Sequence, residues 1–275
     1  MSEAIAAGDG IVLADSVTRL GPEDAGKVLI GASHGGLYAA NLAVRAGLRA
    51  VILNDAGIGK DEAGVAGLAY LDDFGMAAAT IGHDTARIGD GRDMAARGVI
   101  TRVNAAAARV GCTPGMTCAE AARRLVAAVL PARRPDALAE TRHVVRAAPG
   151  EPVVWALDSA ALVGAQDAGQ IVITGSHGGL LGGRPETALK AACRAALFND
   201  AGIGIDRAGI TRLPALDTRG IAAATVAAMS ARIGDGRSAW ESGIISHVNQ
   251  KAAGSGAAPG MTVQQLVACL IARPA

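Results

Sequence analysis

Aromatic side chains are scarce in this sequence of 275 residues, which holds two Phe, two Trp and two Tyr. So few rings argue against a stacking platform for the bases of single-stranded nucleic acid. An excess of charge of one sign is also missing, because 26 basic and 25 acidic side chains leave a formal net charge of +1. A protein with so balanced a charge has no strong field to attract a polyanion. We therefore expect no nucleic-acid partner.

Long apolar runs are also missing, since none reaches the roughly 18 residues that a membrane-spanning helix needs. The first ten residues lack the basic segment and apolar stretch that are typical of a secretory signal. The four cysteines, Cys112, Cys118, Cys193 and Cys269, show neither a Cys-x-x-Cys spacing nor a dense disulfide pattern. We interpret them as free, buried thiols of a cytoplasmic protein without a membrane partner.

Small residues are abundant, with 62 Ala and 37 Gly. At 51% hydrophobic and 19% charged residues, the chain lies outside the disordered class and can bury a sizeable core. We expect this core to be tight and lined by Ala rather than by aromatic rings. The length corresponds to about two domains of roughly 150 residues, or to one large domain.

Four blocks of sequence occur twice and in the same order. They read Ser-His-Gly-Gly, Asn-Asp-Ala-Gly-Ile-Gly, Ala-Arg-Ile-Gly-Asp-Gly-Arg and Pro-Gly-Met-Thr. The first copies begin at Ser33, Asn54, Ala86 and Pro114, and the second copies at Ser176, Asn199, Ala231 and Pro259. The offset grows from 143 to 145 residues, which fits a short insertion after Gly179. Such ordered identity indicates a tandem duplication.

The joint between the copies is predicted within Pro131–Asp136, where two prolines and paired arginines interrupt helical patterning. This gives a first repeat over residues 1–133 and a second over 134–275. The copies agree mainly at Ser, His, Asn, Asp, Arg and Gly, whereas core packing alone would preserve size and polarity. We expect two α/β units related by an approximate two-fold axis. The sequence leaves open whether they form one composite site or two separate sites.

Hydrophobic patterning in the first copy alternates short apolar runs with helical segments. It predicts strands over 27–32, 50–53 and 76–81, and helices over 37–46, 63–74 and 98–110. The second copy follows the same order, with strands over 170–174, 195–198 and 221–226. This alternation predicts the α/β class, with parallel strands joined by right-handed crossovers. A β-hairpin is expected ahead of each copy, with turns at residues 8–10 and 149–151.

The polar blocks share one position, because three of them begin where a predicted strand ends. In open α/β sheets, ligands bind outside the carboxyl ends of the strands. Side chains from three loops would therefore converge on one rim in each copy. This placement favours a functional rim over three unrelated turns.

The stretch Gly31-Ala32-Ser33-His34-Gly35 fits the pattern G-x-S-x-G between a predicted strand and a helix. Residues 31–59 resemble the nucleophile elbow, helix and next strand of the α/β hydrolases. The resemblance implies Ser33 as a nucleophile and Gly35 as a close-packing residue. The second copy departs from it, carrying Thr174 in place of the first Gly. Because a duplicated half of this length does not match that family's single larger domain, we do not assign the chain to it.

Ser33 and Ser176 are the candidate nucleophiles. A serine nucleophile needs a general base within hydrogen-bond reach. No repeated pair of serine and base is visible, since His83 and His247 each occur in one copy only. The alternative is a helix N-cap, which is compatible with anion binding at the same turn.

His34 and His177 are the stronger catalytic candidates, because imidazole is the usual general acid or base near neutral pH. Asp55 and Asp200 follow the neighbouring predicted strand, where each could orient the imidazole or abstract a proton itself. The alternative for these carboxylates is an Asx turn that closes Asp-Ala-Gly.

The other polar identities are predicted to bind substrate. They are Gly35, Gly36, Asn54, Arg87 and Asp90 in the first copy and Gly178, Gly179, Asn199, Arg232 and Asp235 in the second. The arginines could grip a carboxylate or phosphate with two donors, with the neighbouring Asp as an ion-pair partner. The asparagines could hold a substrate oxygen or only the turn, and the glycine amides could face an anion.

Motifs for cofactors are lacking: we find no Walker Lys-Ser/Thr, no full G-x-G-x-x-G and no close pair of His ligands. We expect neither a cofactor nor a metal. The leading prediction is a small-molecule metabolic enzyme that hydrolyses an amide or ester in a carboxylate-bearing or cyclic metabolite, with loop amides as an oxyanion hole. The alternatives are a lyase or isomerase that uses His and Asp for proton transfer, and a non-catalytic protein that binds an anionic ligand. An Ala-rich surface helix could also mediate homo-oligomers.

Overall fold

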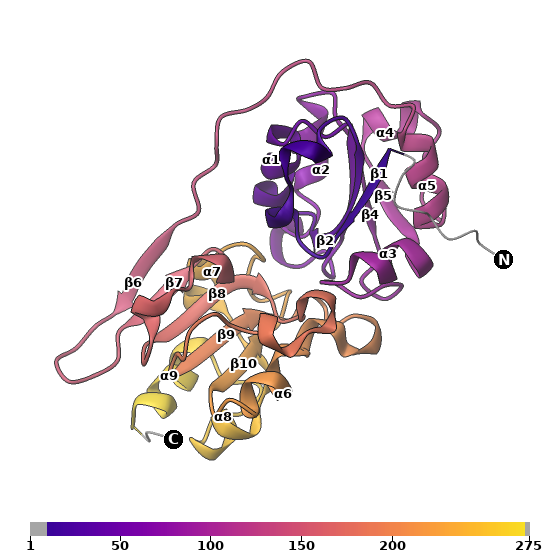
Figure 1. Cartoon of the computed structure of the whole chain (residues 1–275). Coiled ribbons are helices and arrows are strands. Elements are labelled where there is room, and N and C mark those ends of the chain that lie inside the picture. The colour runs from indigo at the N-terminus through magenta and orange to yellow at the C-terminus, as the bar shows by residue number, and fades with distance from the viewer. Residues whose placement is uncertain (1–9, 273–275) are drawn as a thin grey trace. The chain divides into compact units, whose positions relative to one another are not determined.

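The chain forms two compact units, each built around one β-sheet, and the computed structural model describes residues 10–272 (Figure 1). Within these, unit 1 comprises residues 10–58, 62–138 and 204–206, and unit 2 comprises 59–61, 139–203 and 207–272. Each unit therefore includes a three-residue segment that is distant from the rest of it in sequence. The repeat boundary at residues 133 and 134 stays a prediction. No helix among residues 10–272 is long and apolar enough to cross a membrane.

Unit 1 has a five-stranded sheet in the order β1-β2-β3-β4-β5. Its strands are β1 (Ile11–Ala14), β2 (Val28–His34), β3 (Ala50–Asn54), β4 (Ala77–Ile81) and β5 (Ile100–Val103). Its helices are α1 (Leu37–Arg45), α2 (Gly67–Asp72), α3 (Gly91–Arg97), α4 (Ala105–Arg109) and α5 (Cys118–Leu125). The first four strands are parallel, and β5 is antiparallel to β4.

Both faces of this sheet are covered by helices, as the alternating side chains of the buried strands require. Val28 and Ile30 of β2 pack in one cluster with Leu125 of α5. Leu29, between them, packs in the opposite cluster with Val44 of α1. Helices α1 and α2 lie on one side of the strands and α3 and α5 on the other (Figure 1). Unit 1 is thus a three-layer α/β/α arrangement.

Unit 2 has a six-stranded sheet in the order β11-β10-β9-β8-β7-β6. Its strands are β6 (Arg142–Arg146), β7 (Val154–Leu157), β8 (Ile171–His177), β9 (Ala195–Asn199), β10 (Ala222–Val226) and β11 (Ile245–Val248). Its helices are α6 (Arg212–Asp217), α7 (Gly236–Ser242), α8 (Gln250–Gly254) and α9 (Val263–Ala272). Strands β7 to β10 are parallel, and the two outer strands β6 and β11 are antiparallel to their neighbours.

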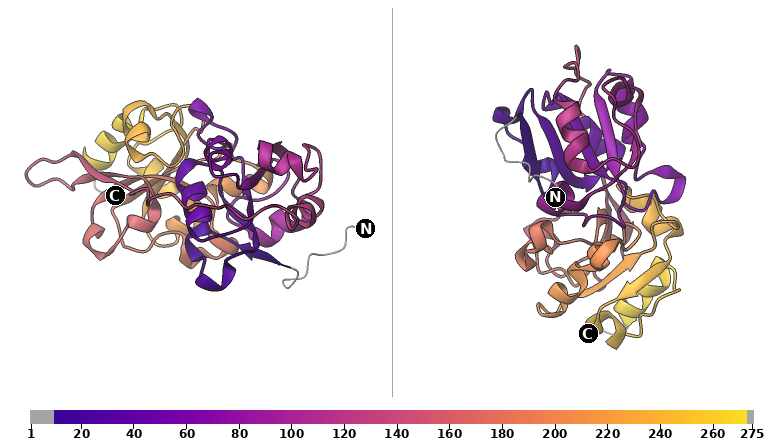
Figure 2. Two further views of the ribbon diagram at one scale, coloured as in Figure 1. Left: turned by 90° about the horizontal axis from the view of Figure 1, so that it is seen from above. Right: turned by 90° about the vertical axis from the view of Figure 1, so that its right-hand side faces the viewer.

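The sheet of unit 2 also buries both faces. Ile173 packs in one cluster with Leu266 of α9, and Val172 packs in the other with Leu216 of α6. Figure 2 lets the strands and the flanking helices be followed from two further directions. The predicted α/β class is confirmed, with sheets that are rich in parallel strands but not wholly parallel. Most of the buried strand positions are aliphatic, and Phe198 of β9 is the one aromatic side chain among the largest fully buried residues of the described chain.

One predicted helix is wrong. Residues 98–110 were expected to be helical, but they form strand β5 followed by the short helix α4. Asn104 marks the change, because its Oδ1 accepts hydrogen bonds from the amides of Ala78 in β4 and Ala107 in α4. The side chain thus ends the strand and caps the helix at once. Helix α3 lies ahead of β5, over residues for which no helix or strand was predicted, and α2 is shorter than the predicted 63–74.

The connection between β8 and β9 also departs from the prediction that the second copy repeats the first. Over the fully described residues 178–194 it contains two 3-10 turns, Leu181–Gly183 and Pro185–Thr187, and no counterpart of α1. Gly182 and Gly183 have φ values of 60° and 68°, and Pro185 lacks an amide hydrogen. These residues stop an α-helix from forming there.

The hairpin predicted around residues 149–151 is present, since β6 and β7 are antiparallel on either side of that turn. The matching turn predicted at residues 8–10 falls mostly outside the described residues. The first described strand, β1, is parallel to β2.

The cysteines have free thiols. Cys112, Cys118 and Cys193 are buried, as predicted, whereas Cys269 is only half-buried. Burial raises the pKa of Cys118 to about 12. A thiol held protonated in this way is a poor nucleophile.

Candidate functional site

Polar side chains of unit 1 gather at the carboxyl ends of β2, β3 and β4. His34 is the last residue of β2, Asn54 is the last residue of β3, and Asp55 follows it directly. His83 lies two residues beyond the end of β4. We call these four residues and Thr101 of β5 the polar edge of unit 1. A parallel sheet brings such strand ends to one side, which is where α/β proteins bind ligands.

The backbone after β3 is strained. The φ angles are 50° at Ala56, 73° at Gly57, 63° at Ile58 and 72° at Gly59, so four residues in a row are left-handed. Two of the four carry a β-carbon, and Ile58 is also β-branched, for which this region costs about 1–2 kcal/mol per residue. Strained backbone of this kind clusters at functional sites.

Side chains of the polar edge support this turn. Asn54 is fully buried; its Oδ1 accepts from the amide of Ala56 at 2.9 Å, and its Nδ2 donates to the carbonyl of Ala86 at 3.3 Å. The amide of Gly57 donates to Asp55 Oδ1 at 3.1 Å, which is the Asx turn considered from the sequence. Of the two roles considered for Asn54, its contacts are those of a residue that holds the turn.

Asp55 also binds His83. The Nδ1 atom of His83 lies 2.9 Å from Asp55 Oδ1, and the amide of His83 donates to the same oxygen at 2.9 Å. Thr101 donates from Oγ1 to the other carboxylate oxygen at 3.2 Å. The Asp55 side chain is 5% exposed and that of His83 is 30% exposed, so the carboxylate is buried while the imidazole reaches the surface.

The charge state of Asp55 follows from these contacts. Burial alone would raise the pKa of its carboxyl group, but hydrogen bonds from the ring and amide of His83, the charge of that ring and the amide of Gly57 together hold the pKa below its usual value. An ionised carboxylate only accepts hydrogen bonds, so Nδ1 of His83 carries a hydrogen in this pair. When this ring is neutral, its basic lone pair is therefore on Nε2, as in other imidazole–carboxylate pairs that act as bases.

His34 is held differently. Its Nδ1 accepts a hydrogen bond from the amide of Gly36 at 3.2 Å, which assigns the ring hydrogen to Nε2. Burial lowers the pKa of His34 to about 4. At neutral pH this imidazole is therefore uncharged and can donate from Nε2, but it is a weak base. Of the two histidines of this edge, His83 is the better suited to accept a proton.

The glycines after His34 were predicted to offer amides to an anion, but both amides already have acceptors in the protein. Gly35 donates to the carbonyl of Asn54 at 2.8 Å, and Gly36 donates to His34. Gly35 packs closely, as the hydrolase resemblance implied: a β-carbon there would lie 2.7 Å from the carbonyl oxygen of Gly64 and 2.9 Å from Cγ2 of Thr80. Because Gly35 has no side chain, the turn after β2 packs directly against Gly64 and Thr80.

Gly35→Ala is expected to lower the free energy of unfolding by about 1–3 kcal/mol, since backbone and Thr80 must move to admit the methyl group. Urea denaturation followed by circular dichroism measures this difference. Gly254→Ala in α8 is the matched control, because a β-carbon there meets nothing within 4 Å. An equal loss of stability in both variants would contradict the close packing at Gly35.

Ser33 lies inside strand β2, not on a turn between strand and helix. Its φ is not among the positive values, so the strained elbow that the resemblance suggested is not formed. The chain turns only at Gly35 and Gly36, and Gly36, not Ser33, precedes α1 as its N-cap. The Ser33 hydroxyl accepts a hydrogen bond from the amide of Val17 at 3.1 Å, and among the described residues none of its hydrogen bonds joins it to an imidazole. Its role as a nucleophile stays a prediction.

Unit 2 repeats much of this arrangement. Its turn after β9 has φ values of 50°, 73° and 65° over residues 201–203. Asn199 bonds the amide of Ala201 and the carbonyl of Ala231, and His177 Nδ1 accepts from the amide of Gly179. The amide of Gly178 donates to the carbonyl of Asn199. Ser176 Oγ accepts from the amide of Ala160 at 2.9 Å.

The units differ at the position of His83. Its counterpart in unit 2 is Ala228, whose amide donates to Asp200 Oδ1 at 2.9 Å, as the amide of His83 does to Asp55. The carboxylate of Asp200 therefore holds its turn without an imidazole from this position. The pair of carboxylate and imidazole belongs to unit 1.

Arg87 was predicted to grip an anionic substrate with Asp90 as its ion-pair partner. Its guanidinium instead pairs with Asp206, at 2.9 Å from Nη2 and 3.0 Å from Nε, and Arg97 joins the same carboxylate at 2.6 Å. These contacts, led by the hydrogen bond from Arg97, hold the pKa of Asp206 below its usual value. Asp90 is the N-cap of α3 and accepts from the amide of Asp93. A substrate anion would have to displace Asp206 from Arg87.

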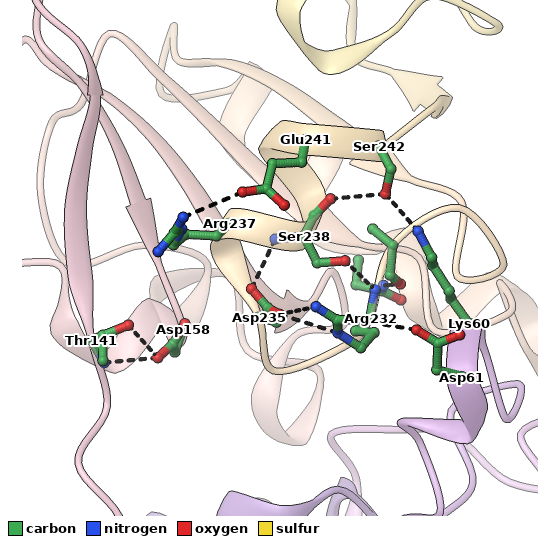
Figure 3. A network of polar contacts seen from close by, with 12 residues as sticks. Lys60, Asp61, Thr141, Asp158, Arg232, Asp235, Arg237, Ser238, Glu241 and Ser242 are labelled. Carbon is green, nitrogen blue, oxygen red and sulfur yellow. Dashed lines mark hydrogen bonds and ion pairs between the residues drawn. The ribbon is translucent and has the colours of Figure 1, made fainter.

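Arg232 of unit 2 does pair with Asp235, as predicted, with Nη2 and Oδ2 3.0 Å apart (Figure 3). Its other partner is Asp61, at 3.1 Å, from the segment 59–61 of that unit. Asp235 is at the same time the N-cap of α7, accepting from the amide of Ser238. Lys60 donates to Ser242 Oγ at 2.8 Å, and this bond is drawn in Figure 3. Both shared arginines are thus engaged by carboxylates of the protein.

His83 and Thr101 were missed as site residues. His83 occurs in one copy only, and identity between the copies was the guide to the site. Its position in the sequence could have identified it as a site residue, since it follows the end of a predicted strand just as Asp55 does. Thr101 was hidden by the wrong assignment of residues 98–110 to a helix. Among residues 10–272 there is no group of three or more His, Cys, Asp or Glu side chains placed to hold a metal ion.

Comparison with known proteins gives no relative: no family model, no curated protein and no solved structure matches this chain.

Proposed function

We propose that unit 1 is the catalytic part of a small-molecule enzyme in which His83, oriented by Asp55, transfers a proton. The observation that carries this proposal is the 2.9 Å contact between Asp55 Oδ1 and His83 Nδ1, with a buried carboxylate and a partly exposed ring. A carboxylate on Nδ1 orients the imidazole, selects its tautomer and stabilises the imidazolium that forms when Nε2 accepts a proton.

The reaction class that this edge supports best is proton transfer at carbon, as in a lyase or isomerase. Abstraction of a hydrogen next to a carbonyl places negative charge on the carbonyl oxygen, which needs a hydrogen-bond donor. The Nε2–H of neutral His34 would supply this donor from the end of β2, which pairs with the strand β3 that Asp55 follows. The substrate is then a small carbonyl compound.

Hydrolysis of an amide or ester, the leading prediction from the sequence, is the second candidate. The observation in its favour is the same pair, because His83 could activate a water molecule in place of the Ser33 hydroxyl. The hydroxyl of Ser33 accepts from Val17, which gives no support for its activation by a base. If a water molecule activated by His83 is the nucleophile, Ser33 takes no part in the reaction.

We also propose that the two units arose by duplication and that unit 2 has kept the fold without the base. The equivalent bonds of Asn54 and Asn199, and the replacement of His83 by Ala228, support this. We keep an anionic substrate as part of the proposal. The argument from Arg87 and Arg232 is weaker than it was from the sequence, because both arginines already pair with carboxylates of the protein. The non-catalytic alternative keeps the same edge for ligand binding alone.

The test is a screen of small keto acids, hydroxy acids, amides and esters in D₂O, followed by proton NMR. The wild-type protein is expected to exchange a hydrogen next to a carbonyl, or to convert at least one compound, and Asp55→Asn is expected to lose that activity. Hydrolysis products alone would favour the second candidate. Binding without exchange or conversion across the panel would contradict an enzyme and support the binding alternative.

A further inference from the structure

Unit 2 contains a cavity of about 350 Å³ that is separate from the residues considered so far. It lies against α6, strand β11 and the start of α8. Its apolar wall includes Ile210, Leu213 and Val248, and its polar wall includes Arg207, Asp217 and His247. The size falls at the small end of ligand pockets. Since water occupies about 30 Å³ per molecule in the liquid, the space corresponds to about a dozen water molecules.

One residue that lines the cavity, His247, has an unsatisfied polar atom. The Nδ1 atom of His247 is buried and has no hydrogen-bond partner among the described residues. Buried polar atoms in folded proteins are nearly always hydrogen-bonded, so this atom is an exception that a small shift of the ring toward a ligand or water molecule in the cavity would remove. His247 lies on β11, paired in register with Thr225 of β10.

Arg207 lines the same cavity, and its guanidinium forms no ion pair or side-chain hydrogen bond within the described part of the chain. Its backbone is left-handed, with φ of 57°, a conformation that a side chain of this size rarely adopts. The equivalent Glu62 of unit 1 has the same conformation, with φ of 54°, so the strain belongs to the turn and the unpaired charge is what distinguishes Arg207.

The equivalent positions in unit 1 carry an ion pair that unit 2 lacks. Glu62 and Arg102 stand 145 residues before Arg207 and His247, and they form an ion pair of 3.0 Å. In unit 2 the acid is replaced by Arg207 and the base by His247, so the two groups cannot neutralise each other. An anion between them would restore the balance of charge that unit 1 achieves with its own side chains.

The carboxylate of Asp217 does not fill this role. Its two oxygens accept the amides of Gln250 and Lys251, at 3.0 Å each, at the start of α8. Its charge is thus compensated by backbone donors, and it would repel a second acidic group. A ligand with one carboxylate fits these walls better than one with two.

We infer that this cavity binds a small monocarboxylic acid with an apolar body. The carboxylate accepts from the Arg207 guanidinium and the His247 ring, and the body packs on Ile210, Leu213 and Val248. The inference is independent of the proposed proton transfer, which uses residues of unit 1.

The probe is hexanoate, compared with hexanol and hexylamine, which share its chain and differ in charge. Titrations of the whole protein are followed by the amide NMR signals of Val248 and Gln250. Hexanoate is expected to saturate these shifts, and Arg207→Gln and His247→Gln are each expected to weaken it at least about tenfold, the effect of losing a hydrogen bond to a charged group. Arg102→Gln, the counterpart of His247 in unit 1, is the matched control and should leave the affinity unchanged.

Several results would overturn the inference. Equal affinity for hexanol would mean an apolar cavity without an anion site, and tighter binding of hexylamine would assign the ligand to Asp217. Unchanged affinity in both unit 2 variants would separate the binding from Arg207 and His247. If no probe saturates at millimolar concentration, water alone satisfies His247 and the site is not one for carboxylic acids.

Discussion

His83→Gln is expected to slow turnover of the compound found in the D₂O screen by about 10²–10⁴-fold, the usual contribution of a positioned acid or base. The loss should fall on kcat, because Gln keeps the size and polarity of the side chain but cannot accept and release a proton. Little change in folding is expected, because the partly exposed Gln side chain can still donate a hydrogen bond to Asp55. Steady-state kinetics at several pH values measure the effect.

Asp55→Asn separates orientation of the ring from proton transfer itself. The amide group can donate to Nδ1, which would move the ring hydrogen to Nε2 and remove the basic lone pair from that atom. Nitrogen-15 spectra of the imidazole report this change of tautomer independently of any substrate. His143→Gln, on β6 of unit 2, is the control for loss of a histidine as such. If His83→Gln and His143→Gln have the same activity, His83 is not the base.

The strand ends of unit 1 could be predicted from the sequence because apolar runs stop there abruptly. Residues 50–53 and 76–81 were predicted as strands, and β3 and β4 occupy 50–54 and 77–81. Once these ends were known, the position of Asp55 at the edge followed from the geometry of parallel sheets. Strand β5 was missed because it is only four residues long and leads directly into an Ala-rich helix.

The partners of the polar residues could not be predicted in the same way. The partner of Arg87 is Asp206, 119 residues away, so no local pattern connects them. The sequence offered Asp90 instead, three residues on, and that carboxylate caps a helix. Likewise, the strain at Ile58 has no signal in a single sequence, because an isoleucine is ordinarily taken as a residue of a strand or of the core.

The second large effect expected is a loss of stability in acid that depends on His34. Folding lowers the pKa of this imidazole from an ordinary 6.5 to about 4, because the folded protein disfavours its charged form. Above pH 6.5 neither state binds the proton, and the full stability is present. As the pH falls below 6.5 the unfolded chain takes up a proton that the folded chain refuses, so the free energy of unfolding decreases until pH 4, by about 3 kcal/mol in total.

Denaturant titrations between pH 7 and pH 4 test this for the wild type, His34→Gln and His143→Gln. His34→Gln is expected to flatten the dependence on pH by about 3 kcal/mol over this range, whatever its stability at pH 7, because the titrating group is gone. His143→Gln, on β6 of unit 2, is the control for removal of a histidine as such. Direct NMR titration provides the decisive observation: a His34 ring that protonates near pH 6.5 would contradict the neutral donor on which the proposed stabilisation of the substrate oxygen depends. A ring that stays neutral at pH 5 would leave His34 as a donor and His83 as the base.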